Sequence, residues 1–186
     1  MNKHKELVEE INVIAKENLK KDGKLAPIAF VIKNTQMIAP ILLDFRASQE
    51  KYKSCKYAGA IAKYLNADAV ILVSDVAMKE YKSKEEADFA VRNYSTESPL
   101  SYPESMRVDG IFLLVIDLET KKIEGYMQLY EKKGDNYTFK NLEDFSGVTG
   151  IGGMIQESVI EGYDLLVSKE DFDKYLKEKN FMGGMF

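Results

Sequence analysis

Apolar residues recur at intervals of three and four near the start of the chain. Between His4 and Lys21 this spacing gives one apolar helical face, made of Leu7, Val8, Ile11, Ile14, Ala15 and Leu19. Gly23 follows as a residue that commonly ends helices. The pattern predicts an amphipathic helix that stops at Gly23.

Two nearly continuous apolar runs come next. Pro27 to Lys33 and Met37 to Asp44 are rich in β-forming residues, and Asn34-Thr35-Gln36 separates them. This arrangement predicts a hairpin. Because both runs are apolar almost throughout, we expect them to be central strands of a sheet.

A helical repeat and a short apolar run then follow the hairpin. Ser48 can cap a helix that continues to about Asn66, and Ala69 to Ser74 predicts a buried strand. A strand, a helix and a strand joined by short loops can form a crossover. We therefore expect Met37 to Leu43 and Ala69 to Val73 to be parallel neighbours.

The periodic pattern breaks at about residues 76–105. A capping box at Ser83-Lys84-Glu85-Glu86 predicts a helix to about Asn93, and a polar stretch with Pro99 and Pro103 follows. Long irregular segments in compact domains often carry function, although mobile surface loops have the same composition. We expect an insertion here.

The last part of the chain predicts three strands and two helices. Arg107 to Leu118 and Ile123 to Glu131 form a hairpin around Glu119-Thr120-Lys121-Lys122, and Asn136 to Lys140 adds a shorter strand. Helices are expected from about Met154 to Val167 and from Lys169 to Lys179. The apolar tail, residues 181–186, is expected to dock on the domain.

Together these elements predict one α+β domain over residues 1–186. Its sheet is mostly antiparallel, with about five strands and flanking helices. The element order is helix, two strands, helix, strand, insertion, three strands and two helices. This order resembles that of profilin-like and roadblock-like domains by analogy, and a fold of this kind does not fix a function.

Composition narrows the class of protein. The chain has 26 basic and 30 acidic residues, and only Arg46, Arg92 and Arg107 are arginines. This balance argues against nucleic-acid binding, which needs a concentrated positive field. The sequence shows neither a signal-peptide pattern nor an apolar run long enough to span a membrane, so we expect a cytoplasmic protein with no membrane partner.

Cysteine and histidine are too scarce for several kinds of chemistry. His4 is the only histidine and is expected at a frayed terminus, whereas Cys55 is the only cysteine and lies on an apolar helix face. Nucleophilic triads, zinc sites and intramolecular disulfides are therefore not expected. No cofactor is predicted except Mg²⁺ under one alternative below.

Four carboxylates lie near the ends of predicted strands. Asp75 ends a buried strand, and Glu97, Glu104 and Asp109 flank or begin the next long one. Asp75, Glu104 and Asp109 could converge on Mg²⁺, because that ion prefers oxygen ligands. The simpler interpretation is that all four are surface turn and cap residues.

A loose nuclease-like spacing also involves Asp109. With Glu119-Thr120-Lys121 it imitates the Asp then Glu-x-Lys pattern of PD-(D/E)xK nucleases, in which Lys121 would orient the attacking water. The alternative is that Glu119 to Lys122 simply makes a solvated hairpin turn.

A glycine-rich loop precedes the helix predicted at Met154. In Gly147 to Gly153, the backbone amides of Gly150, Gly152 and Gly153 could hold an anion at the helix entrance. The loop lacks the Gly-Lys-Ser/Thr ending of a P-loop. A tight connection that permits close helix packing is the alternative.

The stretch from Ala67 to Asp75, with Glu97-Ser98-Pro99 and Glu104 before the next strand, resembles a group of uncharacterised microbial proteins. In that group an Ala-Asp-Ala strand ends in Ser-Glu, and a Ser-Glu-Asp-Pro segment follows. Here Asp75 replaces the first glutamate. The resemblance directs attention to this loop and implies no activity.

The sequence favours a non-catalytic binding protein that self-associates as a homo-oligomer. Residues 75–105, including Glu97, would hold a protein partner or a small ligand. One alternative is a metal-dependent phosphoesterase or nuclease that uses Asp75, Glu104, Asp109 and Lys121. The other is a nucleotide sensor or sponge at the glycine-rich loop.

Overall fold

The computed structural model describes residues 3–79, 85, 107–145, 153–165 and 168–178. Its helices are α1 (Lys5–Asp22), α2 (Ser48–Tyr64), α4 (Gly153–Leu165) and α5 (Lys169–Glu178). Its strands are β1 (Ile28–Lys33), β2 (Gln36–Leu42), β3 (Ala69–Lys79), β4 (Arg107–Asp117), β5 (Ile123–Lys133) and β6 (Asn136–Asp144). Among these helices, none is both long and apolar enough to cross a membrane.

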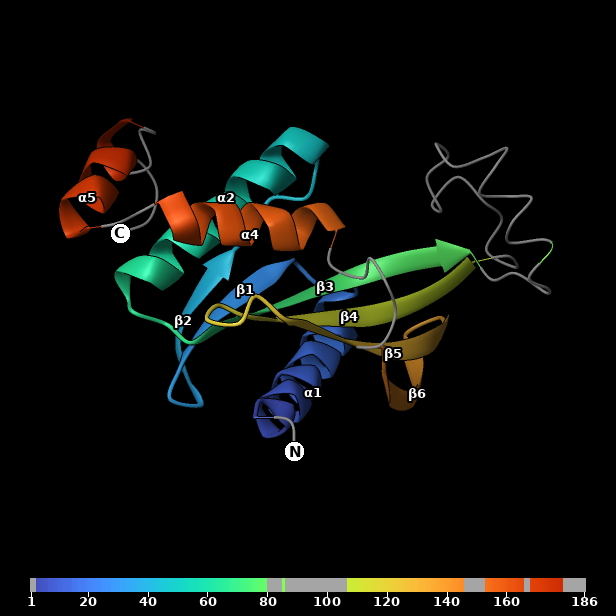
Figure 1. Cartoon of the computed structure of the whole chain (residues 1–186). Helices are drawn as coiled ribbons and strands as arrows, with labels where there is room; N and C mark the ends of the chain where they lie inside the picture. The colour runs from blue at the N-terminus through green and yellow to red at the C-terminus, as the bar shows by residue number, and fades with distance from the viewer. Residues whose placement is uncertain (1–2, 80–84, 86–106, 146–152, 166–167, 179–186) are drawn as a thin grey trace.

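The strands form one antiparallel sheet in the order β2-β1-β3-β4-β5-β6. Helix α1 lies on one face of this sheet, and α2 and α4 lie on the other (Figure 1). The predicted α+β class, antiparallel sheet and flanking helices are confirmed. The sheet has six strands and not about five.

Helix α1 ends as its sequence predicts. Gly23 adopts a left-handed conformation with φ of 70°, and its N–H donates to the carbonyl of Leu19 at 2.9 Å. A left-handed residue with a hydrogen bond back into the last turn satisfies a carbonyl that the helix leaves open. The chain therefore turns sharply toward β1.

The expected parallel pairing of β2 with β3 is wrong. β1 lies between them and pairs antiparallel with both. The sequence of β1 explains this position, because its middle residues are buried on both faces and both of its edges need a partner. The hairpin occupies one edge, and the helical return through α2 brings β3 to the other.

β2 is an edge strand and not the expected central one. The N–H of Leu43 donates to the carbonyl of Pro27 at 2.8 Å, so the backbone of Pro40, three residues earlier, faces away from β1. Proline has no N–H, and at a position that faces away from β1 this removes no hydrogen bond from the sheet. The expected cap at Ser48 is also wrong, since Ala47 precedes α2 without a side-chain cap.

Two apolar cores lie on opposite faces of the sheet. The first is under α1 and contains Leu7, Val8, Ile11, Phe30, Ile71, Ile111, Leu113 and Tyr126. The second is under α2 and α4 and contains Val31, Ile41, Cys55, Val70, Leu72, Leu114, Ile116 and Val159. Helix α5 packs outside α2, where the ring of Phe172 stacks on Tyr64 with centroids 4.5 Å apart.

Helices α2 and α4 touch through their backbones at two glycines. A Cβ atom on Gly59 would overlap the carbonyl oxygen of Val159, and one on Gly162 would overlap that of Lys56. Both clashes are with backbone atoms, which cannot rotate away. The two glycines therefore fix how closely α4 approaches α2.

Substitution of Gly59 by alanine should destabilise the protein although alanine favours helices. Helix propensity alone would stabilise by about 1 kcal/mol, whereas overpacking costs about 1–3 kcal/mol or more. Urea unfolding should show a net loss for Gly59→Ala and for Gly162→Ala. The exposed substitution Glu157→Ala is the control, and a gain in stability for either glycine variant would contradict the described crossing.

Candidate functional site

A hollow of about 700 Å³ lies along β3 where β1 no longer covers it. We call it the edge hollow. It is lined by Gly23, Phe45, Lys51, Ser74, Asp75, Val76, Ala77, Asp109, Phe112, Tyr130, Lys132, Tyr137 and Ile155. These residues come from elements on both faces of the sheet, so the hollow is not confined to one of them.

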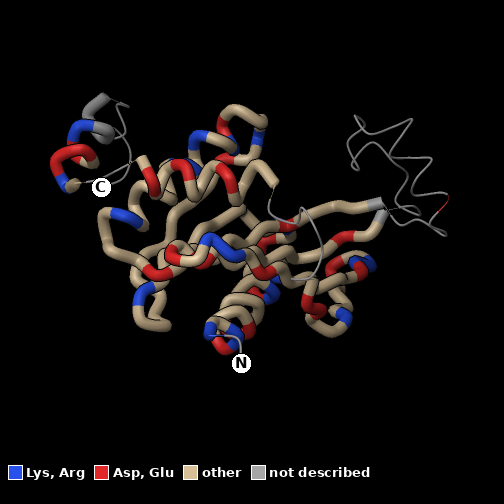
Figure 2. Tube along the Cα trace, viewed as in Figure 1, with Lys and Arg blue, Asp and Glu red and all other residues tan. Residues whose placement is uncertain are grey.

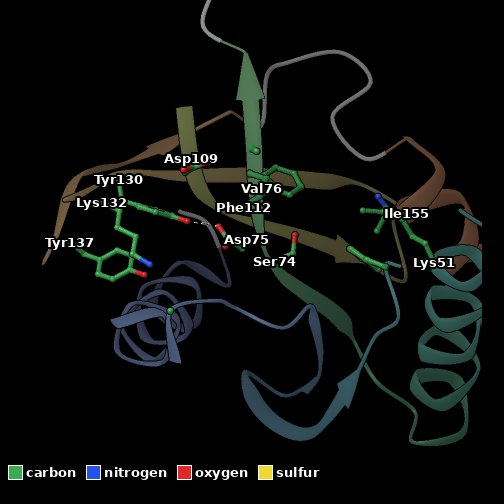
Figure 3. A pocket seen from close by; sticks show the side chains of 13 residues that line it. Lys51, Ser74, Asp75, Val76, Asp109, Phe112, Tyr130, Lys132, Tyr137 and Ile155 are labelled. Atoms are coloured by element: carbon green, nitrogen blue, oxygen red, sulfur yellow. Dashed lines mark hydrogen bonds between the residues drawn. The ribbon is translucent and has the colours of Figure 1, made fainter. Parts of the chain in front are cut away.

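The position of β3 explains this shape. Ser74, Asp75, Val76 and Ala77 are consecutive residues, and side chains of a strand alternate between the two faces. A hollow that touches all four must follow the edge of the strand. Figure 3 shows Tyr130, Lys132 and Tyr137 on one side of β3, and Ile155 and Lys51 on the other.

The side of the hollow next to α1 is polar. The hydroxyl of Tyr130 donates to Asp75 Oδ1 at 2.7 Å. Cross-strand register places Asp109 between Ala77 of β3 and Tyr130 of β5, on the same face as Asp75. Two carboxylates and a phenol thus share one wall.

The phenol of Tyr130 is held in its neutral form. Burial raises its pKa far above the ordinary value, and the hydrogen bond to Asp75 and the negative charge of that carboxylate raise it further. Tyr130 is 7% exposed. At neutral pH it is therefore a fixed hydrogen-bond donor in this wall.

Lys132 and Tyr137 close the polar side near the end of α1. The ammonium of Lys132 lies 5.3 Å from the centre of the Tyr137 ring. The interaction with the Tyr137 side chain raises the pKa of Lys132. This lysine keeps its charge and is drawn toward the ring of Tyr137, beside the carboxylates.

The opposite side of the hollow is mostly apolar. Phe112 is the cross-strand partner of Ser74, and Ile155 of α4 and Phe45 complete the surface. The ammonium of Lys51 lies 4.6 Å from the centre of the Phe45 ring. The two sides of β3 therefore offer different chemistry to a bound molecule.

The structure brings together two of the predicted carboxylates. Asp75 and Asp109 face the edge hollow, whereas Glu97 and Glu104 lie outside the described residues. Asp75 does not end its strand as expected, because β3 continues to Lys79. Within the described part of the chain, His, Cys, Asp and Glu side chains form no group of three that could hold a metal ion.

The nuclease-like residues are separated. Asp109 lies near the start of β4, and Lys121 lies in the turn beyond its other end. The ammonium of Lys121 pairs with Asp164 of α4. The Glu119 to Lys122 segment joins β4 to β5, which agrees with the simpler interpretation as a hairpin connection.

Gly150 and Gly152 also lie outside the described residues, as do the predicted helix start at Ser83 and the tail, residues 181–186. Gly153 is the first residue of α4 and has a φ of 43°. A positive φ favours glycine, so this residue suits the turn into the helix.

Neither His4 nor Cys55 borders the edge hollow. His4 directly precedes α1 and is 3% exposed, so the expectation that this residue is frayed is wrong, and burial lowers its pKa. Cys55 is fully buried on α2, and burial raises its pKa to about 12. The prediction of an inert thiol agrees with this position.

Sequence reasoning missed Tyr130, Lys132 and Tyr137. In β5, Tyr126, Gln128, Tyr130 and Lys132 alternate with apolar or acidic residues, and polar groups at every second position of a long strand could have indicated a polar wall. That signal does not say what the residues face. The partner carboxylates on β3 and β4 became visible only with the strand register.

Comparison of the chain with protein-family models, with curated proteins and with solved structures finds no match. The predictions below therefore rest on the geometry of the site itself. In Figure 2, basic and acidic residues intermingle along the helices.

Removing the hydroxyl of Tyr130 should destabilise the protein by about 1–2 kcal/mol at neutral pH. Because the folded-state pKa is raised, the stabilisation is complete below the unfolded pKa of about 10 and is lost as pH rises above it. Urea unfolding at pH 8 and pH 11 should show a smaller pH-dependent loss for Tyr130→Phe than for the wild type. Tyr52→Phe removes the exposed bond to Glu161 and is the control; equal losses in wild type and Tyr130→Phe would contradict the assignment.

Cys55 should resist thiol reagents while the protein is folded. A buried thiol with a pKa of about 12 has almost no thiolate at pH 8. Reaction with Ellman's reagent should be slow in buffer and complete within minutes in guanidinium chloride. Rapid labelling of the folded protein would show that α2 is not packed as described.

Proposed function

We propose that this chain is a non-catalytic binding domain and that the edge hollow is its binding site. The observation that carries the proposal is the lining of the hollow by four consecutive residues, Ser74 to Ala77. A hollow along a strand edge presents both faces of the sheet to a bound molecule. This geometry suits recognition of a partner or ligand.

The polar wall favours a positively charged group. Among the described residues that line the hollow, Asp75 and Asp109 share this wall with the ammonium of Lys132, which lies 5.3 Å from the centre of the Tyr137 ring. A cation next to the carboxylates would replace part of their hydration with an ion pair and the Tyr130 hydroxyl would keep Asp75 oriented. The ligand class supported best is therefore an amine or guanidine.

Self-association remains a prediction, and β2 is the described surface that supports it. No charged residue occurs from Gln36 to Leu42, and Leu42 is 62% exposed. Uncharged apolar edges are uncommon on surfaces that stay in water. A second copy of the chain is the partner proposed for this edge.

A chemical-shift titration tests the proposed site. The ¹⁵N-labelled protein would be titrated separately with spermidine, ADP and MgCl₂. Spermidine should shift the amide signals of Asp75, Ala77 and Asp109, and Asp109→Asn should weaken that binding by about fivefold, as expected for a partly exposed ion pair. Glu119→Gln, at the far end of β4, should leave it unchanged.

Three results would count against this proposal. Unchanged hollow signals in the presence of spermidine would remove the assignment of a cation site. Saturable shifts of Asp75 and Asp109 with Mg²⁺ would instead support the metal-dependent phosphoesterase, with Glu104 as a further ligand. Shifts with ADP at Gly153 would support the nucleotide sensor.

A further inference from the structure

The pairing between β1 and β3 ends early. The last pair is Ile28 with Val73, whereas β3 continues beside β4 to the pair of Lys79 with Arg107. Pro27 precedes Ile28, and its carbonyl accepts from Leu43 on the β2 side, so its backbone does not face β3. In the part of the chain that the structure describes, no strand pairs with β3 beyond Val73 on this side.

The backbone alternation shows which groups face that side. The N–H of Leu118, directly after β4, donates to the carbonyl of Asp68, directly before β3, at 3.0 Å, in register with the β3–β4 pairing. Since the N–H and C=O groups of successive residues point to opposite edges of a strand, those of Val76 face β4. Those of Ala77 face the other edge, beyond the end of the pairing with β1. Ala77 also lines the edge hollow.

We propose that the edge hollow binds an extended peptide, which adds to the sheet as a strand beside β3. This inference rests on the proposed function and names its ligand. The N–H and C=O of Ala77 would pair with the peptide backbone, as in other cases of strand addition. The strand would occupy the place in the sheet where β1 ends.

The two sides of the hollow specify the peptide side chains. The side chains of successive residues of an added strand point to opposite faces of the sheet. One set would lie against Asp75 and Asp109 and is expected to be basic. The other set would lie against Phe112 and Ile155 and is expected to be apolar.

A strand-forming peptide fits this hollow better than a compact ligand does. A compact amine would reach the carboxylates and leave the apolar side empty. An extended chain that passes the strand edge uses both sides at once, and its backbone satisfies the edge of β3. The expected ligand is therefore a peptide that alternates basic and apolar residues.

The test uses a fluorescein-labelled hexapeptide that alternates lysine and valine, measured by fluorescence anisotropy with the full chain. Two further versions carry N-methyl groups on either the odd or the even residues. Strand addition predicts that one set weakens binding by at least about tenfold, because its N–H groups face β3, and that the other changes it less than about twofold. A peptide that alternates glutamate and valine should bind far more weakly.

Two protein variants test the position on β3. Ala77→Pro removes the N–H that faces the hollow and should weaken peptide binding by about tenfold, while Ala77→Val keeps that N–H and should bind within about threefold of the wild type. Because Ala77→Pro could disturb folding, its circular dichroism and melting temperature are compared with those of Ala77→Val. The N-methyl comparison needs no variant and decides the matter alone.

The outcomes separate this inference from the proposed function. Equal effects of the two N-methyl sets, or no binding of the unmodified peptide, would overturn strand addition. If spermidine still shifts the hollow signals in that case, the hollow remains a cation site without strand addition. If neither spermidine nor the peptide binds, both proposals fail.

Discussion

The long pairing of β3 with β4 is the constraint on which the candidate site depends. Both strands have 11 residues and remain paired along their whole length, whereas β1 has 6. The difference leaves one end of β3 supported by β4 alone. Because β1 begins only at Ile28, the rest of β3 has no partner strand on that side among the described residues. Polar residues line one face of the sheet there, and mostly apolar residues line the other.

Helix packing fixes the walls of this region. Gly59 and Gly162 let α2 and α4 meet through their backbones, and the first turn of α4 then places Ile155 on the apolar side. On the other face, the left-handed Gly23 ends α1 beside Lys132. Burial near this helix end keeps Tyr130 neutral, so the Asp75 carboxylate has a fixed donor.

Most elements could be predicted from the sequence, because local signals determine them. The apolar repeat and Gly23 define α1, and the charged turn after Asp117 defines the β4–β5 hairpin. Strand order could not be predicted, since the sequence of an apolar strand such as β1 does not indicate which strands pair with its two edges. The assumption of a crossover between adjacent strands therefore placed β3 beside β2.

The site was only partly predictable for the same reason. Asp75 and Asp109 were identified as carboxylates near strand ends, but their meeting with Tyr130 depends on register across three strands. Register is a long-range property, and a shift of one residue would turn all these side chains to the other face. Glu97, Glu104, Gly150 and Gly152 remain predictions, because they lie outside the described residues.

Amide hydrogen exchange at neighbouring residues of β3 tests the central claim most directly. The amide of Val76 points to β4 and should be protected, whereas the amide of Ala77 faces the open edge and should exchange at least about tenfold faster in the free protein. This contrast between adjacent residues is what an unpaired edge at Ala77 predicts. Equal and strong protection of the two amides would contradict it and show that the edge is already paired.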